Sequence, residues 1–132
     1  MKVGGHVTPT ATRFFSQNGE LWGVANSFFT ETKYGICYSD HCAVVHWLSW
    51  LRRSVAVSQG MGGKAPFHIK LGVASIKNTI WPKSSWSGGG PNVAVEDALE
   101  LTFQIYSADN EEVVPIVRQI NNSVRDAYGL SV

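Results

Sequence analysis

Near its C-terminus this chain carries the pattern of an apolar strand that runs directly into an amphipathic helix, and this pattern limits the possible folds more than any other stretch. The strand alternates polar residues with four apolar ones: Leu99, Leu101, Phe103 and Ile105. Beyond residue 109, apolar residues recur at helical spacing: Val113, Ile116, Val117, Ile120, Val124 and Ala127. The first pattern predicts a strand with one buried face, and the second predicts a helix with one apolar stripe. We therefore expect a C-terminal helix over residues 109–128 that covers the apolar face of a sheet.

Both ends of this helix carry matching signals. Ser107 or Asp109 is the expected N-cap, because short polar side chains accept hydrogen bonds from the free N–H groups of the first turn. Glu111 and Glu112 place negative charge at the positive end of the helix dipole. Gly129 follows the last apolar position and is expected to end the helix in a left-handed conformation.

The first third of the chain is predicted to contain strands. Thr8–Ser16 and Glu20–Phe28 are joined by Asn18-Gly19, which is the strongest short signal for a β-hairpin. Residues 8–28 are therefore expected to form an N-terminal hairpin. A turn-like stretch with a short strand at Tyr34–Tyr38 follows.

The middle of the chain is predicted to supply the main antiparallel sheet, over residues 43–106. Ala43–Leu51 fits either a helix or a strand. Arg53–Ser58 alternates as a strand, and Phe67–Ile76 places its odd-numbered residues on an apolar face. The predicted fold class is therefore α+β, with all 132 residues in a single domain that is long enough to form a core.

One helix is too small to cover a sheet of five or more strands. Apolar patches larger than a few hundred Å² are unusual on monomers, so the uncovered part of such a sheet needs another cover. We expect a second copy of the chain to provide it, with the C-terminal helix packing on the partner subunit of an obligate symmetric dimer.

Charge is unevenly distributed along the chain. The formal net charge is only +1, but residues 41–95 contain no acidic residue and carry six basic ones: Arg52, Arg53, Lys64, Lys70, Lys77 and Lys83. This asymmetry indicates an anionic partner, the alternative being a chance cluster on a solvated face. There is no apolar run long enough to span a bilayer and no leader segment, which favours a cytoplasmic or particle-bound protein.

The two cysteines do not form a disulfide framework. Cys37 and Cys42 are expected to be reduced and packed, and the sequence leaves open whether they form disulfides between subunits. With His46 they have the spacing of an incomplete metal site, or of a Cys–His nucleophilic pair that lacks an orienting third group. We predict no metal, no cofactor, no catalytic residue and no small-molecule substrate.

Three segments resemble the coat proteins of single-stranded RNA bacteriophages, the levivirus family. Leu99–Glu112, which reads LELTFQIYSADNEE, resembles the last strand of that family and the start of its first C-terminal helix. Arg53–Gln59, a glycine-rich turn and Phe67–Leu71 resemble the central hairpin that contacts RNA. Asn18-Gly19 resembles the turn of the N-terminal hairpin. The resemblance covers residues 52–129 well and the first third of the chain loosely.

This resemblance implies a structural capsid protein that is not an enzyme. In the family, two subunits form one continuous antiparallel sheet, each C-terminal helix crosses onto the partner, and dimers assemble into a T=3 icosahedral shell. The polar face of the sheet lines the interior and packages genomic RNA. In several members it also binds an RNA hairpin and represses replicase translation. The implied location is the virion, assembled in the cytoplasm of a bacterial host, with no part for a membrane.

The resemblance places RNA contacts on the central hairpin and on the last strand. Six positions there have side chains suited to phosphate or base contacts: Arg52, Ser54, Ser58, His68, Lys70 and Thr102. The stacking Tyr of the family and its neighbouring Asn correspond to Glu96 and Ala98, which neither stack on a base nor donate to one. RNA recognition here would rest on other contacts or on electrostatics.

The loop at residues 78–92 corresponds to the family's pore loop. It is expected to mediate contacts between dimers through Trp81, Trp86, Gly88, Gly89 and Gly90. The apolar strand and helix residues named at the outset form the expected core and dimer contact. The alternative function is a non-viral dimeric RNA-binding or ligand-binding module with a similar antiparallel sheet.

Overall fold

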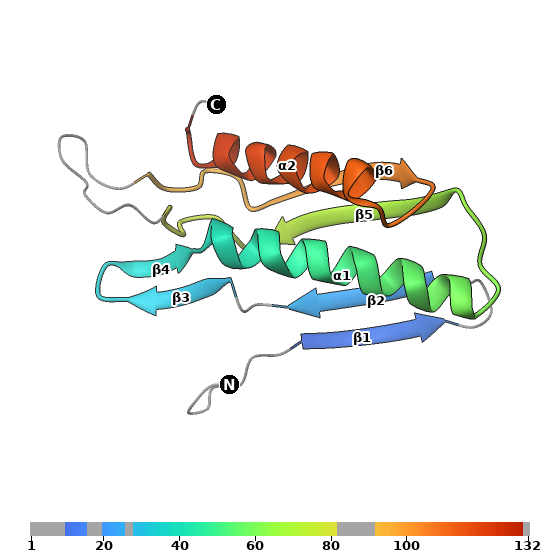
Figure 1. The fold of residues 1–132 in the computed structure, drawn as a ribbon. Helices are drawn as coiled ribbons and strands as arrows, with labels where there is room; N and C mark the ends of the chain where they lie inside the picture. Colours follow the sequence, from blue (N-terminus) through green and yellow to red (C-terminus); the bar gives the residue numbers. More distant parts are fainter. Residues whose placement is uncertain (1–9, 16–19, 26–27, 82–91, 131–132) are drawn as a thin grey trace.

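The fold is that of a computed structural model, which describes residues 20–25, 28–81 and 92–130 together with the backbone of residues 10–15. Its elements follow in the order β1 (Thr10–Phe15), β2 (Glu20–Ala25), β3 (Phe29–Thr32), β4 (Gly35–Tyr38), α1 (Asp40–Gly60), β5 (Phe67–Ala74), β6 (Ala98–Ile105) and α2 (Asn110–Ala127). The strands pair antiparallel in three two-stranded ribbons, β1–β2, β3–β4 and β5–β6. The two helices run antiparallel beside one another along the strands (Figure 1). The α+β class with antiparallel strands is therefore confirmed.

The two N-terminal ribbons include both strands expected from the hairpin signal. β1 and β2 pair in register from Thr10 opposite Ala25 to Phe15 opposite Glu20, while the Asn18-Gly19 turn lies outside the described residues. The expected short strand ending at Tyr38 is β4, and its partner β3 was predicted as a turn. β3 is only four residues long, which is too short for its alternation to stand out from that of a loop.

The β5–β6 ribbon has one apolar face and one polar face, as the alternation predicts. Its register sets Ile69 opposite Phe103 and Leu71 opposite Leu101 on the apolar face. Leu99 and Ile105 lie on the same face, and all these side chains are buried or half-buried. The predicted strands over residues 67–76 and 99–105 are confirmed with small shifts at their ends.

Helix α2 covers this apolar face with the stripe read from the sequence. Each stripe residue is at most 7% exposed: Val113, Ile116, Val117, Ile120, Val124 and Ala127. Asp109 is the N-cap residue, although its side chain makes no capping hydrogen bond. Gly129 adopts a φ of +78° after the last turn, where a side chain would be strained.

The segment predicted to begin the main sheet is a helix. Residues 40–60 form α1, so the predicted strand at Arg53–Ser58 is wrong, and the main sheet does not include residues 43–60. The helix starts where Ser39 Oγ accepts the N–H of Cys42 at 3.3 Å. Its buried residues recur every fourth position, at Ala43, Trp47, Leu51 and Val55, which is a helical period. The alternation over six residues was too short to outweigh this longer pattern.

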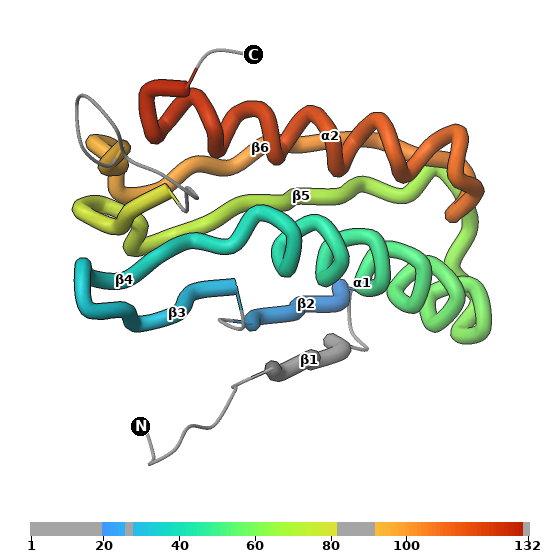
Figure 2. The backbone as a smooth tube through the Cα atoms, turned by 60° about the vertical axis from the view of Figure 1, so that its left-hand side comes forward, coloured from blue at the N-terminus to red at the C-terminus, as the bar shows by residue number. Residues whose placement is uncertain are grey.

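The C-terminal helix packs on its own chain, which corrects the expectation that it covers a partner subunit. α2 contacts β5, β6 and α1 of the same chain. Figure 2 shows α2, β6, β5 and α1 next to one another from top to bottom. The expectation failed because residues 40–60 supply a second helix in place of further strands. Among the described residues, the apolar face of the β5–β6 ribbon is therefore covered by a helix of the same chain.

An aromatic core joins the start of α1 to the end of α2. The rings of Tyr38, Trp81 and Tyr128 lie with centroids 5.4–5.8 Å apart. Thr79 Oγ1 donates to the carbonyl of Ile76 and accepts from the hydroxyl of Tyr128. Burial raises the pKa of Tyr38, and the neighbouring Tyr128 raises it further. Both tyrosines therefore stay neutral as parts of the core.

Trp81 is part of this core and is not a surface residue of a pore loop. Its side chain is 6% exposed, and the guanidinium of Arg125 lies over its ring at 5.2 Å. The expected role of Trp81 in contacts between dimers is therefore wrong. The neighbouring residue Ile80 forms backbone hydrogen bonds with Ile36 and Tyr38. These bonds hold the first part of the predicted pore loop against β4. Trp86, Gly88, Gly89 and Gly90 lie outside the described residues.

The first turn of α2 is stabilised by a carboxylate three residues beyond the N-cap. Glu112 Oε1 accepts the N–H of Tyr106 at 2.7 Å, and Oε2 accepts the hydroxyl of Ser107 at 2.8 Å. These bonds, the one from Tyr106 first, lower the pKa of Glu112. A lowered pKa in the folded state stabilises the fold above the unfolded-state pKa, and this contribution disappears as the pH falls through the folded value.

We expect Glu112→Gln to lower the free energy of unfolding at neutral pH, with the difference from the parent protein shrinking to nothing in acid. Urea unfolding measured across the acidic range would show this convergence. Glu111→Gln is the matched control, because it removes the same charge from the same helical turn. If the two variants show the same pH dependence, the hydrogen bonds of Glu112 contribute nothing specific.

Candidate functional site

The polar face of the β5–β6 ribbon is the surface that gathers most of the predicted contact residues. We call it the outer face and define it by the residues that alternate with the buried ones: His68, Lys70, Gly72 and Ala74 from β5, and Ala98, Glu100, Thr102 and Gln104 from β6. All of these residues are exposed. α2 covers the opposite side of the ribbon, and the other described residues leave the outer face open.

Three of the six predicted RNA-contact residues lie together on the outer face. Lys70 is directly opposite Thr102 in the register, and His68 is directly opposite Gln104. Opposite residues of an antiparallel pair have Cβ atoms about 4.5–5.5 Å apart, so each pair presents its two side chains as one unit. The outer face thus offers a cation, an imidazole, a hydroxyl and an amide within one small area.

The other three predicted residues lie on α1, away from the outer face. Arg52 Nη2 donates to Asn110 Oδ1 at 2.5 Å, which ties α1 to the start of α2. Ser54 and Ser58 are half-buried on the same helix. They were assigned to the sheet through the predicted strand at 53–58, so their separation from His68 follows from the helical conformation of that segment.

Tyr106 is a site residue that the sequence reasoning missed. Its side chain is 60% exposed. Gln104 Nε2 donates to its hydroxyl at 3.2 Å, which shows that the ring lies on the same side of β6 as Gln104. The sequence could have indicated this position, because side chains at residues 102, 104 and 106 of one continuous strand point to the same face. It was overlooked because Tyr106 follows the last strand residue.

The outer face is mixed in charge. Glu100 lies opposite Gly72, and this pair is the next one on the outer face after the pair of Lys70 and Thr102. The basic segment read from the sequence is divided by the fold, because Arg52 and Arg53 lie on α1 while Lys70 lies on the outer face. Among the described residues, the basic side chains of segment 41–95 therefore do not form one continuous cationic surface.

Gly72 allows β6 to approach β5 closely in the middle of the outer face. A Cβ atom at this position would lie 2.4 Å from the carbonyl oxygen of Leu99 and 3.1 Å from Cα of Glu100. Both contacts are with backbone, so a larger residue would push the strands apart. The glycine therefore keeps the two pairs beside it, at Lys70 and at Ala74, in register.

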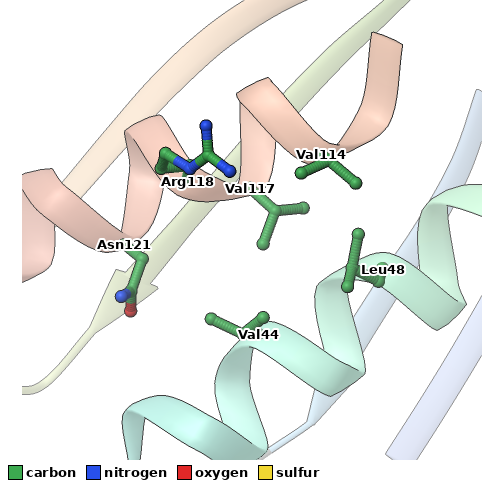
Figure 3. A pocket seen from close by; sticks show the side chains of 6 residues that line it. All are labelled: Val44, Leu48, Val114, Val117, Arg118 and Asn121. Carbon is green, nitrogen blue, oxygen red and sulfur yellow. The ribbon is translucent and has the colours of Figure 1, made fainter. Parts of the chain in front are cut away.

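A small pocket lies between the two helices, on the other side of the molecule from the outer face. It has a volume of about 230 Å³ and is lined by Val44, Leu48, Val114, Val117, Arg118 and Asn121 (Figure 3). Pockets for drug-sized ligands are usually larger, about 300–1,000 Å³. Asn121 Oδ1 is buried there without a hydrogen-bond partner among the described residues. The lining offers no nucleophile and no carboxylate pair.

The cysteine and histidine residues do not form a metal centre in the described part of the chain. No three His, Cys, Asp or Glu side chains within it lie close enough together to hold an ion. Cys37 is half-buried, with its Sγ 3.7 Å from Thr32 Oγ1, and Cys42 is exposed. The ring of His46 packs 5.9 Å from that of Phe28. Burial lowers the pKa of His46, and Arg53 lowers it further.

Comparisons with known proteins gave no relative for this chain. A scan against protein-family models, a search of curated proteins and a search of solved structures each found no match. Among the described residues, neither helix combines the length and the apolar character needed to cross a membrane.

Proposed function

We propose that this chain is a self-assembling coat protein subunit that binds and packages single-stranded RNA. The observation that carries the proposal is the division of the strands into three two-stranded ribbons, one of which presents an open polar face. The proposed role is structural and includes no catalytic step. In this proposal the protein resides in a particle, formed from many copies of the chain around its RNA.

Unpaired strand edges support self-association. An isolated two-stranded ribbon is marginally stable in water, and an unpaired edge offers free N–H and C=O groups to another chain. In the described part of the fold, each of the six strands has one strand neighbour in its ribbon. Each ribbon thus keeps an edge at which a second copy can add its own strands.

Apolar side chains at the surface support contacts on more than one side. Gly23 of β2 faces Trp50 of α1, so alternation turns Trp22 and Val24 away from the helix. Large apolar residues that are 40–75% exposed occur along much of the described chain, among them Trp22, Val24, Ile36, Val45, Val57, Met61, Val93 and Val95. A subunit of a closed shell needs several such contact regions, whereas a simple dimer needs one.

The outer face supports RNA as the anionic partner. Lys70 supplies a point charge for phosphate, while Thr102, Gln104 and His68 supply hydrogen-bonding groups for sugar and base edges. Because α2 closes the opposite face of the same ribbon, the dimer that we propose forms through strand edges and does not exchange helices.

Expression of the full chain in bacteria tests the proposal directly. We expect large particles in electron micrographs of the purified protein, and RNA within them that resists nuclease until the particles are dissociated. A uniform monomer without RNA would contradict the proposal. A discrete dimer that binds RNA would favour the alternative, a stand-alone RNA-binding module, for which the packing of α2 on its own chain is the supporting observation.

A further inference from the structure

Tyr106 is held in place at the end of the outer face. Its N–H donates to Glu112 Oε1 at 2.7 Å, so the backbone here is tied to the first turn of α2. Its hydroxyl accepts a hydrogen bond from Gln104 Nε2 at 3.2 Å. The ring is nonetheless 60% exposed. A large aromatic side chain is thus positioned by two hydrogen bonds and still open to solvent.

We propose that Tyr106 is the platform on which one unpaired nucleobase of single-stranded RNA stacks. This inference rests on the proposed function, because it names a contact within the same outer face. Stacking on an aromatic ring is the usual way in which proteins hold unpaired bases, and it tolerates any base because each has a π face. Tyr106 provides that ring at the border of a polar, partly cationic surface.

The neighbours of Tyr106 fit the remaining parts of a nucleotide. Gln104 uses its amide nitrogen toward the Tyr106 hydroxyl, which leaves its amide oxygen to accept from a base amino group. His68 is opposite Gln104. Lys70 lies two residues beyond His68 on β5, about 7 Å from it along the strand. A base on Tyr106 thus has a hydrogen-bond acceptor beside it and cationic or polar groups along the direction in which the phosphate chain would run.

Fluorescence anisotropy with two labelled probes tests this inference on the full chain. One probe is a short oligoadenylate, and the other is a ribose-phosphate chain of the same length without bases. We expect Tyr106→Ala to weaken binding of the oligoadenylate about 5- to 150-fold and to leave binding of the base-free chain unchanged. Tyr106→Phe should bind both probes like the parent protein, because it keeps the ring.

Three further variants separate stacking from other effects. Tyr106→Leu keeps the bulk without the aromatic face and should behave like Tyr106→Ala. Tyr34→Ala removes another tyrosine of similar exposure, 58%, from the β3–β4 turn and should change neither affinity. Lys70→Ala should weaken the binding of both probes by the same factor. It should also reduce the slope of log affinity against log salt by about 1.

The outcomes distinguish this inference from the proposed function. If the parent protein binds the oligoadenylate but Tyr106→Ala binds it equally well, the stacking role is wrong and RNA binding stands. If the parent protein binds both probes with equal affinity, the bases contribute nothing to binding, so the stacking role is again wrong and RNA binding stands. If the parent protein binds neither probe, both the stacking role and the proposed RNA binding are overturned.

Discussion

Val55→Ala should lower the free energy of unfolding by about 1–3 kcal/mol, whereas Val57→Ala should change it by less than about 0.5 kcal/mol. The two valines are two residues apart in α1, and the helix turns them to different sides. Val55 is 4% exposed and belongs to the core, while Val57 is 43% exposed. Removing two buried methyl groups leaves a cavity, but removing two exposed ones does not.

This pair of variants also decides between helix and strand for residues 53–58. In a strand the two side chains would point to the same face, and both substitutions would have similar effects. In the helix they have unequal effects, and alanine at the exposed position is slightly favoured by helix propensity. Urea unfolding followed by circular dichroism measures both values. Equal losses for Val55→Ala and Val57→Ala would contradict the helical assignment of α1.

Pro115→Ala should raise the free energy of unfolding by about 2 kcal/mol. Pro115 is the sixth residue of α2, beyond the first turn where proline is tolerated, and its side chain is exposed. It has no N–H group to donate to the carbonyl of Glu111, and proline inside a helix costs about 3 kcal/mol relative to alanine. Part of this gain is offset because proline also restricts the unfolded chain, by about 0.4–1 kcal/mol.

Gln119→Ala is the matched control for this prediction. Gln119 lies one turn further along α2 and is also exposed, and its replacement changes only helix propensity, by a few tenths of a kcal/mol at about the resolution of the measurement. Thermal and urea unfolding of the three proteins would give the comparison. A loss of stability in Pro115→Ala would contradict the prediction and would mean that the proline conformation is needed for packing between α2 and α1.

The long helical pattern near the C-terminus predicted its element correctly, whereas the short alternation at Arg53–Ser58 did not. The stripe from Val113 to Ala127 spans four turns, and each of its members is buried in α2. The alternation at Arg53–Ser58 spans six residues and coincides with a helix whose buried positions begin ten residues earlier, at Ala43. A short alternating stretch is compatible with both periods, so the longer repeat has to decide.

The candidate site shows the same difference. Lys70, His68 and Thr102 could be placed on one face from alternation alone, because β5 and β6 are regular and pair in simple register. Arg52 could not, because its position depends on whether residues 40–60 form a helix. Trp81 was read as a loop residue, and its burial depends on contacts with Tyr38 and Tyr128, which are far away in the sequence.

The amino-acid pattern alone was enough to predict the local elements, namely the β5–β6 pair with its apolar and polar faces and the helix that begins after Asp109. These follow from periods of two and 3.6 residues, which depend on neighbours along the chain. The three-dimensional structure was needed to show that α2 packs on its own subunit and that Trp81 is buried against Tyr38 and Tyr128. Those arrangements depend on which distant surfaces bury the most apolar area together, and such pairing is not encoded in any single stretch of residues.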